Sequence, residues 1–273
     1  MYTYTQEVLT IRYLRFALIS LLLSSLLWIV ACSNQSQSDN QLTLEEGVFS
    51  YAMSGLYKPF NYTDSKSGNL AGFDVEIGEA LAKEMGMKPN PVTNPWESII
   101  AGLQANKYDA IIGSMAITPE RDKAVDFTNP YYRSGAQVFV QDKNTSIKSP
   151  EDLKGKKIGV VKASTFSTIA KEYTSEVTEY TSDVTALQDL PTGRIDAVIT
   201  DQAVGFHAIQ EENFPLKEVG KPLNLDEMAI AIPEGNEKLK EKINVALQAI
   251  IEDGTYDQIS QKYFNRNILG EEQ

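Results

Sequence analysis

The segment "GSMAITPERDKAVDFTNPYY", residues 113–132, contains an arginine at a position where a helix normally disfavours a cation. Thr118 is a typical N-cap and Pro119 a typical first helical residue, so the pattern predicts a helix that begins at Thr118. Arg121 would then lie in the first turn, beside the helix end that prefers anions. A planar guanidinium pairs bidentately with a carboxylate, so a bound anion would explain this arginine. The alternative is an exposed arginine on a solvated turn.

Two other segments share a pattern that predicts parallel strands with polar carboxyl ends. "NKYDAIIGS" (106–114) and "GRIDAVITD" (193–201) each contain a basic residue, Asp-Ala, an aliphatic pair and a polar end. Each follows an amphipathic helix pattern. Because ligands bind beyond the carboxyl ends of strands in open α/β sheets, the pair predicts two lobes that each offer one edge to a cleft. The alternative is a coincidental repeat of common α/β sequence.

The elements that must position these residues alternate between strand and helix patterns, which predicts an α/β fold. Apolar residues at helical spacing predict helices at 72–87, 96–107, 168–174, 183–190 and 237–264. Short apolar runs predict strands at 47–53, 108–114, 194–201, the second half of 127–141 and the first part of 153–165. Asp74 is expected to cap the first helix, and Asp253-Gly254 to break the last one in two.

Composition limits the class of protein. The chain has 273 residues, of which 42% are apolar and 23% charged, as in a globular protein with one large domain or two lobes. The net charge of −12 argues against a nucleic-acid partner. There is no cluster with metal-ligand spacing, no phosphate-binding loop and no nucleophile elbow, so we expect neither a metal nor a cofactor. The single histidine, His207, is not expected at a reaction centre.

The N-terminus has the pattern of an export signal. A basic stretch precedes the apolar run 16–31, which is short for a membrane span, and a polar run follows. Cys32, the one cysteine of the chain, stands at the boundary, and the segment resembles the lipobox of bacterial lipoproteins. We therefore expect a lipoprotein signal peptide at 1–31, lipidation of Cys32 and a polar tether at 32–42. An ordinary secretory signal or an uncleaved anchor is the alternative.

Six segments occur in a characteristic order: "GLYKPFNY", "GFDVEIGEALAKEM", "ITPERDKAVDFTNPYY", "DLKGKKIGVVKAST", "GRIDAVITD" and "EDGTYDQISQKYF". In this order they resemble the extracellular solute-binding proteins of family 3, which serve bacterial polar amino acid ABC transporters. The resemblance covers about residues 43–266. It implies the two-lobe periplasmic-binding-protein fold of type II, with two crossing strands as the hinge. Lobe 1 would be 42–134 with 228–268, and lobe 2 would be 138–224.

The same resemblance implies a ligand site between the lobes. Arg121 would bind the α-carboxylate of an amino acid, and Asp201, at the other strand end, would bind its α-ammonium; a strand-end cap is the alternative for Asp201. Tyr57 and Trp96 match positions of aromatic walls, for which core packing is the alternative. The remaining expected ligand-binding residues are Ser54, Ser114, the backbone of Met115, Ala116, Lys162, Thr165 and Thr200.

The implied function is the lipid-anchored binding component of an ABC importer, exported and facing the periplasm or the cell exterior. Its partners would be an amino acid and a membrane permease with a separate ATPase subunit, and the chain is expected to be monomeric and not an enzyme. The alternative is an enzyme of the cyclohexadienyl or arogenate dehydratase type on the same fold, which needs an acid in the cleft. The residues favour a polar, uncharged or acidic ligand, while basic amino acids stay open.

Overall fold

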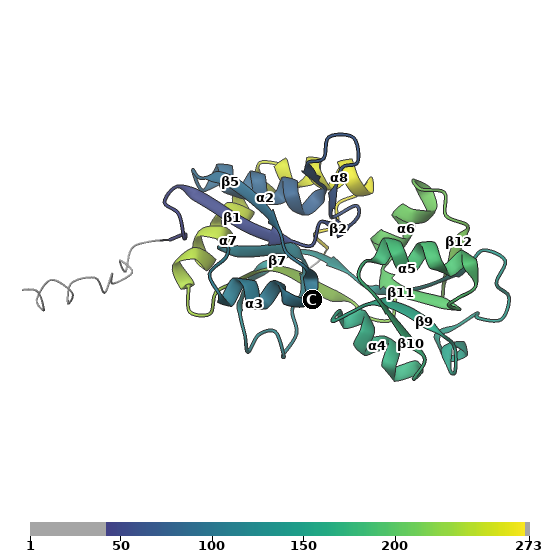
Figure 1. Cartoon of the computed structure of the whole chain (residues 1–273). Helices are drawn as coiled ribbons and strands as arrows, with labels where there is room; N and C mark the ends of the chain where they lie inside the picture. Colours follow the sequence, from purple (N-terminus) through teal and green to yellow (C-terminus); the bar gives the residue numbers. More distant parts are fainter. Residues whose placement is uncertain (1–41, 271–273) are drawn as a thin grey trace, which may run out of the picture. The chain divides into compact units, whose positions relative to one another are not determined.

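The computed structural model describes residues 42–270, so the predicted signal peptide, Cys32 and nearly all of the tether lie outside the described residues. The described chain is α/β, as predicted, with two sheets of five strands and a smaller sheet of three. Figure 1 shows each five-stranded sheet with its own helices, and we call these two groups lobe 1 and lobe 2. No helix in residues 42–270 has the length and apolar character needed to cross a membrane.

Lobe 1 contains the sheet β5–β1–β6–β13–β7. Strands β1, β5 and β6 run parallel, so their carboxyl ends meet at one edge, and β13 is antiparallel to β6 and β7. Helices α2, α7 and α8 pack together over one face, and α3 packs on the other. The bounds are β1 Val48–Met53, β5 Lys88–Thr93, β6 Ala110–Ala116, β7 Asp126–Ser134, β13 Asp226–Ile232, α2 Phe73–Glu84, α3 Ile99–Gln104, α7 Glu237–Glu252 and α8 Thr255–Phe264.

Lobe 2 contains the sheet β10–β9–β11–β8–β12. Here β9, β10 and β11 are parallel and end at one edge, whereas β8 is antiparallel to β11 and β12. Both segments of the shared pattern therefore form strands with a parallel neighbour, as predicted. The bounds are β8 Ala136–Gln141, β9 Ile158–Val161, β10 Val177–Tyr180, β11 Ala197–Asp201, β12 Leu216–Val219, α4 Thr165–Tyr173, α5 Asp183–Asp189 and α6 Gln202–Gln210.

The chain passes between the two sheets twice, from β7 to β8 and from β12 to β13. The two crossings touch. The backbone N–H of Ala136 donates to Oδ1 of Asn224 at 2.9 Å, and the N–H of Leu223 donates to the carbonyl of Ala136 at 2.7 Å. Gly135 lies so close to the second crossing that a Cβ there would stand 2.3 Å from the carbonyl oxygen of Asn224. The crossings therefore form one narrow connection between the lobes.

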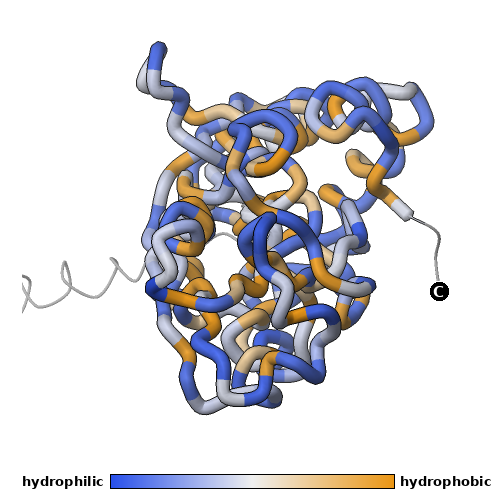
Figure 2. Tube along the Cα trace, turned by 90° about the vertical axis from the view of Figure 1, so that its right-hand side faces the viewer, coloured by the Kyte–Doolittle hydropathy of each residue, from blue (hydrophilic) through white to orange (hydrophobic). Residues whose placement is uncertain are grey.

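Aromatic rings fill the part of lobe 1 that lies behind the strand ends. Phe60, Phe73, Tyr132 and Phe264 form contacts with ring centroids 4.8 to 6.0 Å apart. The small sheet, whose strands are β2 Leu56–Tyr57, β3 Asn61–Thr63 and β4 Leu70–Ala71, is anchored to this cluster through Phe60. Figure 2 shows hydrophilic residues along the outer loops and hydrophobic residues recurring inside the helices and strands. The contacts of Phe60 with the aromatic cluster therefore hold the segment that follows β1 in place.

The prediction of a helix that begins at Thr118 is wrong. Residues 119–124 form turns, and β7 begins at Asp126 after a bend at Val125. The Thr118 hydroxyl accepts a hydrogen bond from the Arg121 N–H at 3.2 Å, as an N-cap would, but no second helical turn follows. The strand 126–134, whose existence the sequence interpretation missed, draws the chain into the sheet instead, where the ladder with β13 satisfies its backbone. Arg121 therefore does not lie at the N-terminus of a helix.

Asp74 does not cap α2, contrary to the prediction. The helix begins at Phe73, and the N-cap position is occupied by Gly72, whose φ of 122° and close approach to a backbone carbonyl exclude a side chain. The Asp74 carboxylate lies within the first turn and is fully buried. It accepts hydrogen bonds from three side chains far apart in the sequence, Asn61, Ser114 and Tyr131. Asp74 therefore joins β3, β6 and β7 instead of ending a helix.

Candidate functional site

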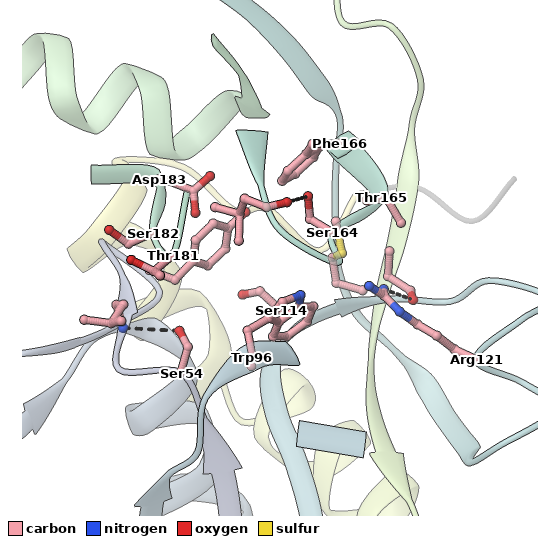
Figure 3. Close-up of a pocket in the computed structure, with 16 residues that line it drawn as sticks. Ser54, Trp96, Ser114, Arg121, Ser164, Thr165, Phe166, Thr181, Ser182 and Asp183 are labelled. Carbon is pink, nitrogen blue, oxygen red and sulfur yellow. Dashed lines mark hydrogen bonds between the residues drawn. The ribbon is translucent and has the colours of Figure 1, made fainter. Parts of the chain in front are cut away.

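A pocket with about 540 Å³ of empty space lies where the strand ends of the two sheets face each other. Loops after β1, β5 and β6 line it from lobe 1, and loops after β9 and β10 line it from lobe 2. Figure 3 shows the lining side chains from both lobes pointing into one space.

The structure brings most of the predicted ligand-binding residues together. Seven of the eleven line the pocket: Ser54, Tyr57, Trp96, Ser114, Ala116, Arg121 and Thr165. Lys162 lines an adjoining pocket. Met115, Thr200 and Asp201 are buried beside the site without lining either pocket. The roles of these residues toward a ligand stay predictions.

Arg121 reaches the pocket from the turn after β6. One guanidinium nitrogen, Nη1, donates to the carbonyl of Ala116 at 2.8 Å, and the group lies over the Trp96 ring, 5.4 Å from its centroid. Burial lowers the pKa of Arg121, although Asp226 and Glu120 act in the opposite direction, and a guanidinium keeps its proton. In the described part of the chain, no other side-chain N–H of Arg121 has a hydrogen-bond partner. The guanidinium is thus held in place with donors left for an anion.

The start of α4 lies near Arg121. Ser164 is its N-cap and accepts from the N–H of Ser167 at 3.2 Å, so Thr165 is the first helical residue. Figure 3 shows Thr165 on the same side of the pocket as Arg121. The turn before α4 contains Ala163 with a φ of 59°, and its carbonyl accepts from Nε1 of Trp96, in lobe 1, at 3.3 Å. The partly positive helix end adds to the guanidinium, so this end of the pocket favours an anion.

Asp183 is a pocket residue that the sequence interpretation missed. It follows the strand β10 and is the first residue of α5, whose N-cap is Ser182. Its carboxyl accepts from the hydroxyl of Thr200, and burial raises its pKa to about 6. Figure 3 shows Asp183 at the end of the pocket away from Arg121. Had β10 been predicted, the rule that ligands bind beyond strand carboxyl ends would have pointed to residues 181–183.

Asp201 has the position of a strand-end cap. Its Oδ1 accepts from the N–H of Ala203 at 2.7 Å and from the Ser134 hydroxyl at 2.9 Å, so it links α6 to the end of β7. Its Oδ2 is buried and has no hydrogen-bond partner among residues 42–270. Burial raises the pKa of Asp201 to about 7, and the charge of Asp183 acts in the same direction. The site therefore contains two buried carboxyls that resist ionisation.

Two serines present acceptor oxygens to the pocket. Ser114, whose φ of 58° is rare outside glycine, donates its hydroxyl proton to Asp74 at 2.9 Å. Ser54 donates to Asn61 Oδ1 at 3.0 Å, and Asn61 in turn donates to Asp74 at 2.6 Å. Because both hydroxyl protons are used inside the protein, the oxygens can only accept from a ligand. The pocket thus offers donors at one end and acceptors along its wall.

Among the described residues, no group of three or more histidine, cysteine, aspartate or glutamate side chains could hold a metal ion. The arrangement is suited instead to a small zwitterion. A carboxylate could pair with the free donors of Arg121, and an ammonium could donate to Asp183 and the serine oxygens.

A sequence model described as "Bacterial extracellular solute-binding proteins, family 3" matches residues 49–266. The chain is 32% identical over 227 residues to the L-cystine-binding protein TcyJ of Escherichia coli (strain K12), covering 82% of this chain and 85% of the relative. It is 38% identical to an L-arginine-binding protein of Pseudomonas aeruginosa, covering 78% and 86%. Among solved structures, the ancestral amino acid-binding protein AncCDT-1, described as a precursor of cyclohexadienyl dehydratase, is 34% identical with a TM-score of 0.75, covering 80% and 96%.

Proposed function

The chain belongs to the bacterial extracellular solute-binding proteins of family 3, and from this we propose that it captures a polar amino acid, or a close derivative, for an ABC importer. One observation carries the proposal: Arg121 from lobe 1 and Asp183 from lobe 2 line the same pocket. A zwitterion that pairs with both would hold the lobes together. Relatives of this chain are amino acid-binding proteins, not enzymes.

The predicted fold class, the two-lobe fold of the type II periplasmic binding proteins, is confirmed by the two sheets and by the solved relatives. In the proposed mechanism lobe 1 comprises 42–134 with 228–268, and lobe 2 comprises 138–224. Ligand binding closes the lobes about the two crossings, since the proposed partners of the ligand's charges lie in different lobes.

The proposal includes a lipid anchor at Cys32 after removal of residues 1–31, with the polar tether 32–42 between the anchor and the fold. The anchored monomer would hand its ligand to a membrane permease, and a separate ATPase subunit would supply the energy. The sequence supports this through the apolar run 16–31 and the single cysteine that follows it.

The side chain of the ligand is the finer question. One relative is a cystine-binding protein and another an arginine-binding protein, so an uncharged and a basic ligand are both candidates. The pocket has a guanidinium at one end and apolar lining from Leu56, Val161 and Phe166. We propose that the α-carboxylate of either ligand pairs with Arg121 and its α-ammonium with Asp183 or Asp201.

Substitution of Arg121 tests the proposal. Arg121→Ala should lower amino acid affinity by about 30-fold to several thousand-fold, since removing a buried charged partner costs about 2–5 kcal/mol. Arg121→Lys should also bind poorly, because an ammonium does not reproduce the planar fork. Calorimetry with cystine and arginine measures the affinity, and thermal melting verifies the fold. Arg194→Ala, on an exposed loop of lobe 2, is the control. Near-wild-type affinity of Arg121→Ala would overturn the site.

A dehydratase activity is the second candidate, because Asp183 lines the pocket with a pKa near 6. A carboxyl with that pKa can act as a general acid near neutral pH. Incubation of the protein with prephenate and arogenate distinguishes the two functions. Conversion that disappears in Asp183→Asn would establish the enzyme, and its absence in a protein that binds amino acids would leave binding alone.

A further inference from the structure

A second pocket, with about 760 Å³ of empty space, adjoins the first. The two share a wall made of Ser54, Leu56, Trp96, Val161 and Thr181. Their shared lining means that one ligand can extend from the Arg121 end, past the Trp96 ring, into the second pocket. The two pockets together therefore leave space for a ligand longer than the head group of one amino acid.

The second pocket carries a charge of each sign. Glu97 comes from lobe 1 and Lys162 from lobe 2, and Oε1 of Glu97 lies 3.5 Å from Nζ of Lys162. Charge-assisted hydrogen bonds are normally 2.7–2.9 Å long, and Lys58 and Glu212, which also form an ion pair between the lobes, are 2.8 Å apart. The side chains of Lys162 and Glu97 are 58% and 41% exposed. Such a loose surface pair contributes little to stability, so separating it costs little.

We propose that Glu97 and Lys162 form a distal subsite for a second α-amino acid group. The ligand would be a two-headed amino acid, with one zwitterion at Arg121 and the other between Glu97 and Lys162. This inference rests on the proposed function, because it requires the first head group to bind at Arg121.

The chemistry of the shared wall fits the linker of such a ligand. Leu56, Val161 and the Trp96 ring place apolar surface between the two charged ends. A thioether or disulfide linker is apolar, so it would lie against this surface. A ligand with a single cationic side chain fits less well, because Lys162 would repel it where Glu97 attracts it.

The test is calorimetry on the full chain with three probes. L-cystine carries two head groups, S-methyl-L-cysteine carries one with a similar sulfur, and L-arginine carries a cationic side chain. The wild type should bind L-cystine at least about tenfold more tightly than S-methyl-L-cysteine. Glu97→Gln and Lys162→Met should each lower the ratio of these two affinities about three- to tenfold. Glu84→Gln and Lys154→Met, exposed outside both pockets, should keep the ratio.

The direction of the Lys162 effect separates the ligand classes. If a cationic side chain occupies the distal pocket, Glu97→Gln weakens L-arginine binding while Lys162→Met strengthens it, and the proposal is overturned. Equal affinity for L-cystine and S-methyl-L-cysteine, with no effect of either variant on the ratio, overturns the distal subsite but leaves the proposed function standing. Binding of none of the amino acids would instead overturn the proposed function itself.

Discussion

Lowering the pH from about 8 to about 5 should stabilise the empty protein and weaken its ligand binding. Burial raises the pKa of Asp183 to about 6 and that of Asp201 to about 7, from 3.8 in the unfolded chain. In this pH range the folded state takes up protons that the unfolded state does not bind, so the free energy of unfolding rises as the pH falls. The stabilisation is complete below 3.8 and is lost as the pH rises through about 6 to 7.

The size of the effect follows from these pKa values. Each unit of pH between the folded pKa and pH 5 is worth about 1.4 kcal/mol per carboxyl. Asp201 alone would therefore gain about 3 kcal/mol and Asp183 about 1 kcal/mol, and the pair gains less than the sum because the charge of Asp183 contributes to the raised pKa of Asp201. For a chain of this size that corresponds to a rise in melting temperature of roughly 5–12 °C. Asp74, whose pKa burial raises to about 6, adds to the rise, whereas His207, whose pKa burial lowers, opposes it.

Ligand binding should depend on pH in the opposite sense. An α-ammonium pairs with an ionised carboxylate, so affinity should fall about tenfold for each pH unit below the relevant pKa. Binding near pH 6 should release a proton, which calorimetry in two buffers of different ionisation enthalpy detects. Asp183→Asn and Asp201→Asn should each raise the stability of the empty protein at pH 8. The carboxyl whose replacement also abolishes the pH dependence of affinity is the partner of the ammonium.

Two results would refute this reasoning. A melting temperature that is unchanged, or lower, at pH 5 would mean that burial does not raise the pKa values of the two carboxyls. If the wild-type affinity stays constant from pH 8 to 5, with no proton release, neither carboxyl has to ionise to bind the ammonium of the ligand. The two measurements are independent, so they separate an error about burial from an error about the site.

Three further outcomes are expected. Cys32→Ser should release the chain to the soluble fraction or block its processing, as cell fractionation would measure; an unchanged lipidated product would contradict the anchor. Lys58→Met breaks the 2.8 Å ion pair with Glu212 between the lobes and should enlarge the ligand-free radius of gyration in small-angle scattering, whereas Lys66→Met should not. Gly135→Ala should lower the free energy of unfolding by more than about 1 kcal/mol, because its Cβ would meet a backbone carbonyl at 2.3 Å. Urea denaturation measures this as a lower midpoint, and an unchanged midpoint would show that the crossings can separate.

Local sequence patterns were sufficient where an element's own residues determine its structure. The apolar runs within 108–114 and 194–201 predict strands, and the strands β6 and β11 that form there are fully buried. The break at Asp253-Gly254 separates α7 from α8, with Gly254 in the left-handed conformation that ends a helix. In each case a short stretch carries the whole signal.

The errors lie where contacts distant in the sequence decide. β10 is a partly exposed strand with polar residues, and its pairing with β9 is what makes it a strand. Because β10 was not predicted, Asp183, which follows it, was not identified as a pocket residue. Asp74 looks like a cap from its neighbours, but its partners Ser114 and Tyr131 lie 40 and 57 residues away. A local sequence pattern cannot predict contacts between residues that far apart in the chain.

In the proposed mechanism, the charges of the site favour a ligand that carries both a carboxylate and an ammonium. Arg121 is held by Ala116 and Trp96 with donors left over, and Asp183 faces the same pocket as a carboxyl that burial keeps from ionising readily. Among residues 42–270, neither the buried guanidinium of Arg121 nor the buried carboxyl of Asp183 has an ion-pair partner, which a ligand would supply. A zwitterion supplies both counter-charges at once, so the closed state gains the most from a ligand with a carboxylate and an ammonium on the same carbon. Anions alone or amines alone would satisfy one lobe and leave the other uncompensated, which selects for amino acids before any contact with their side chains.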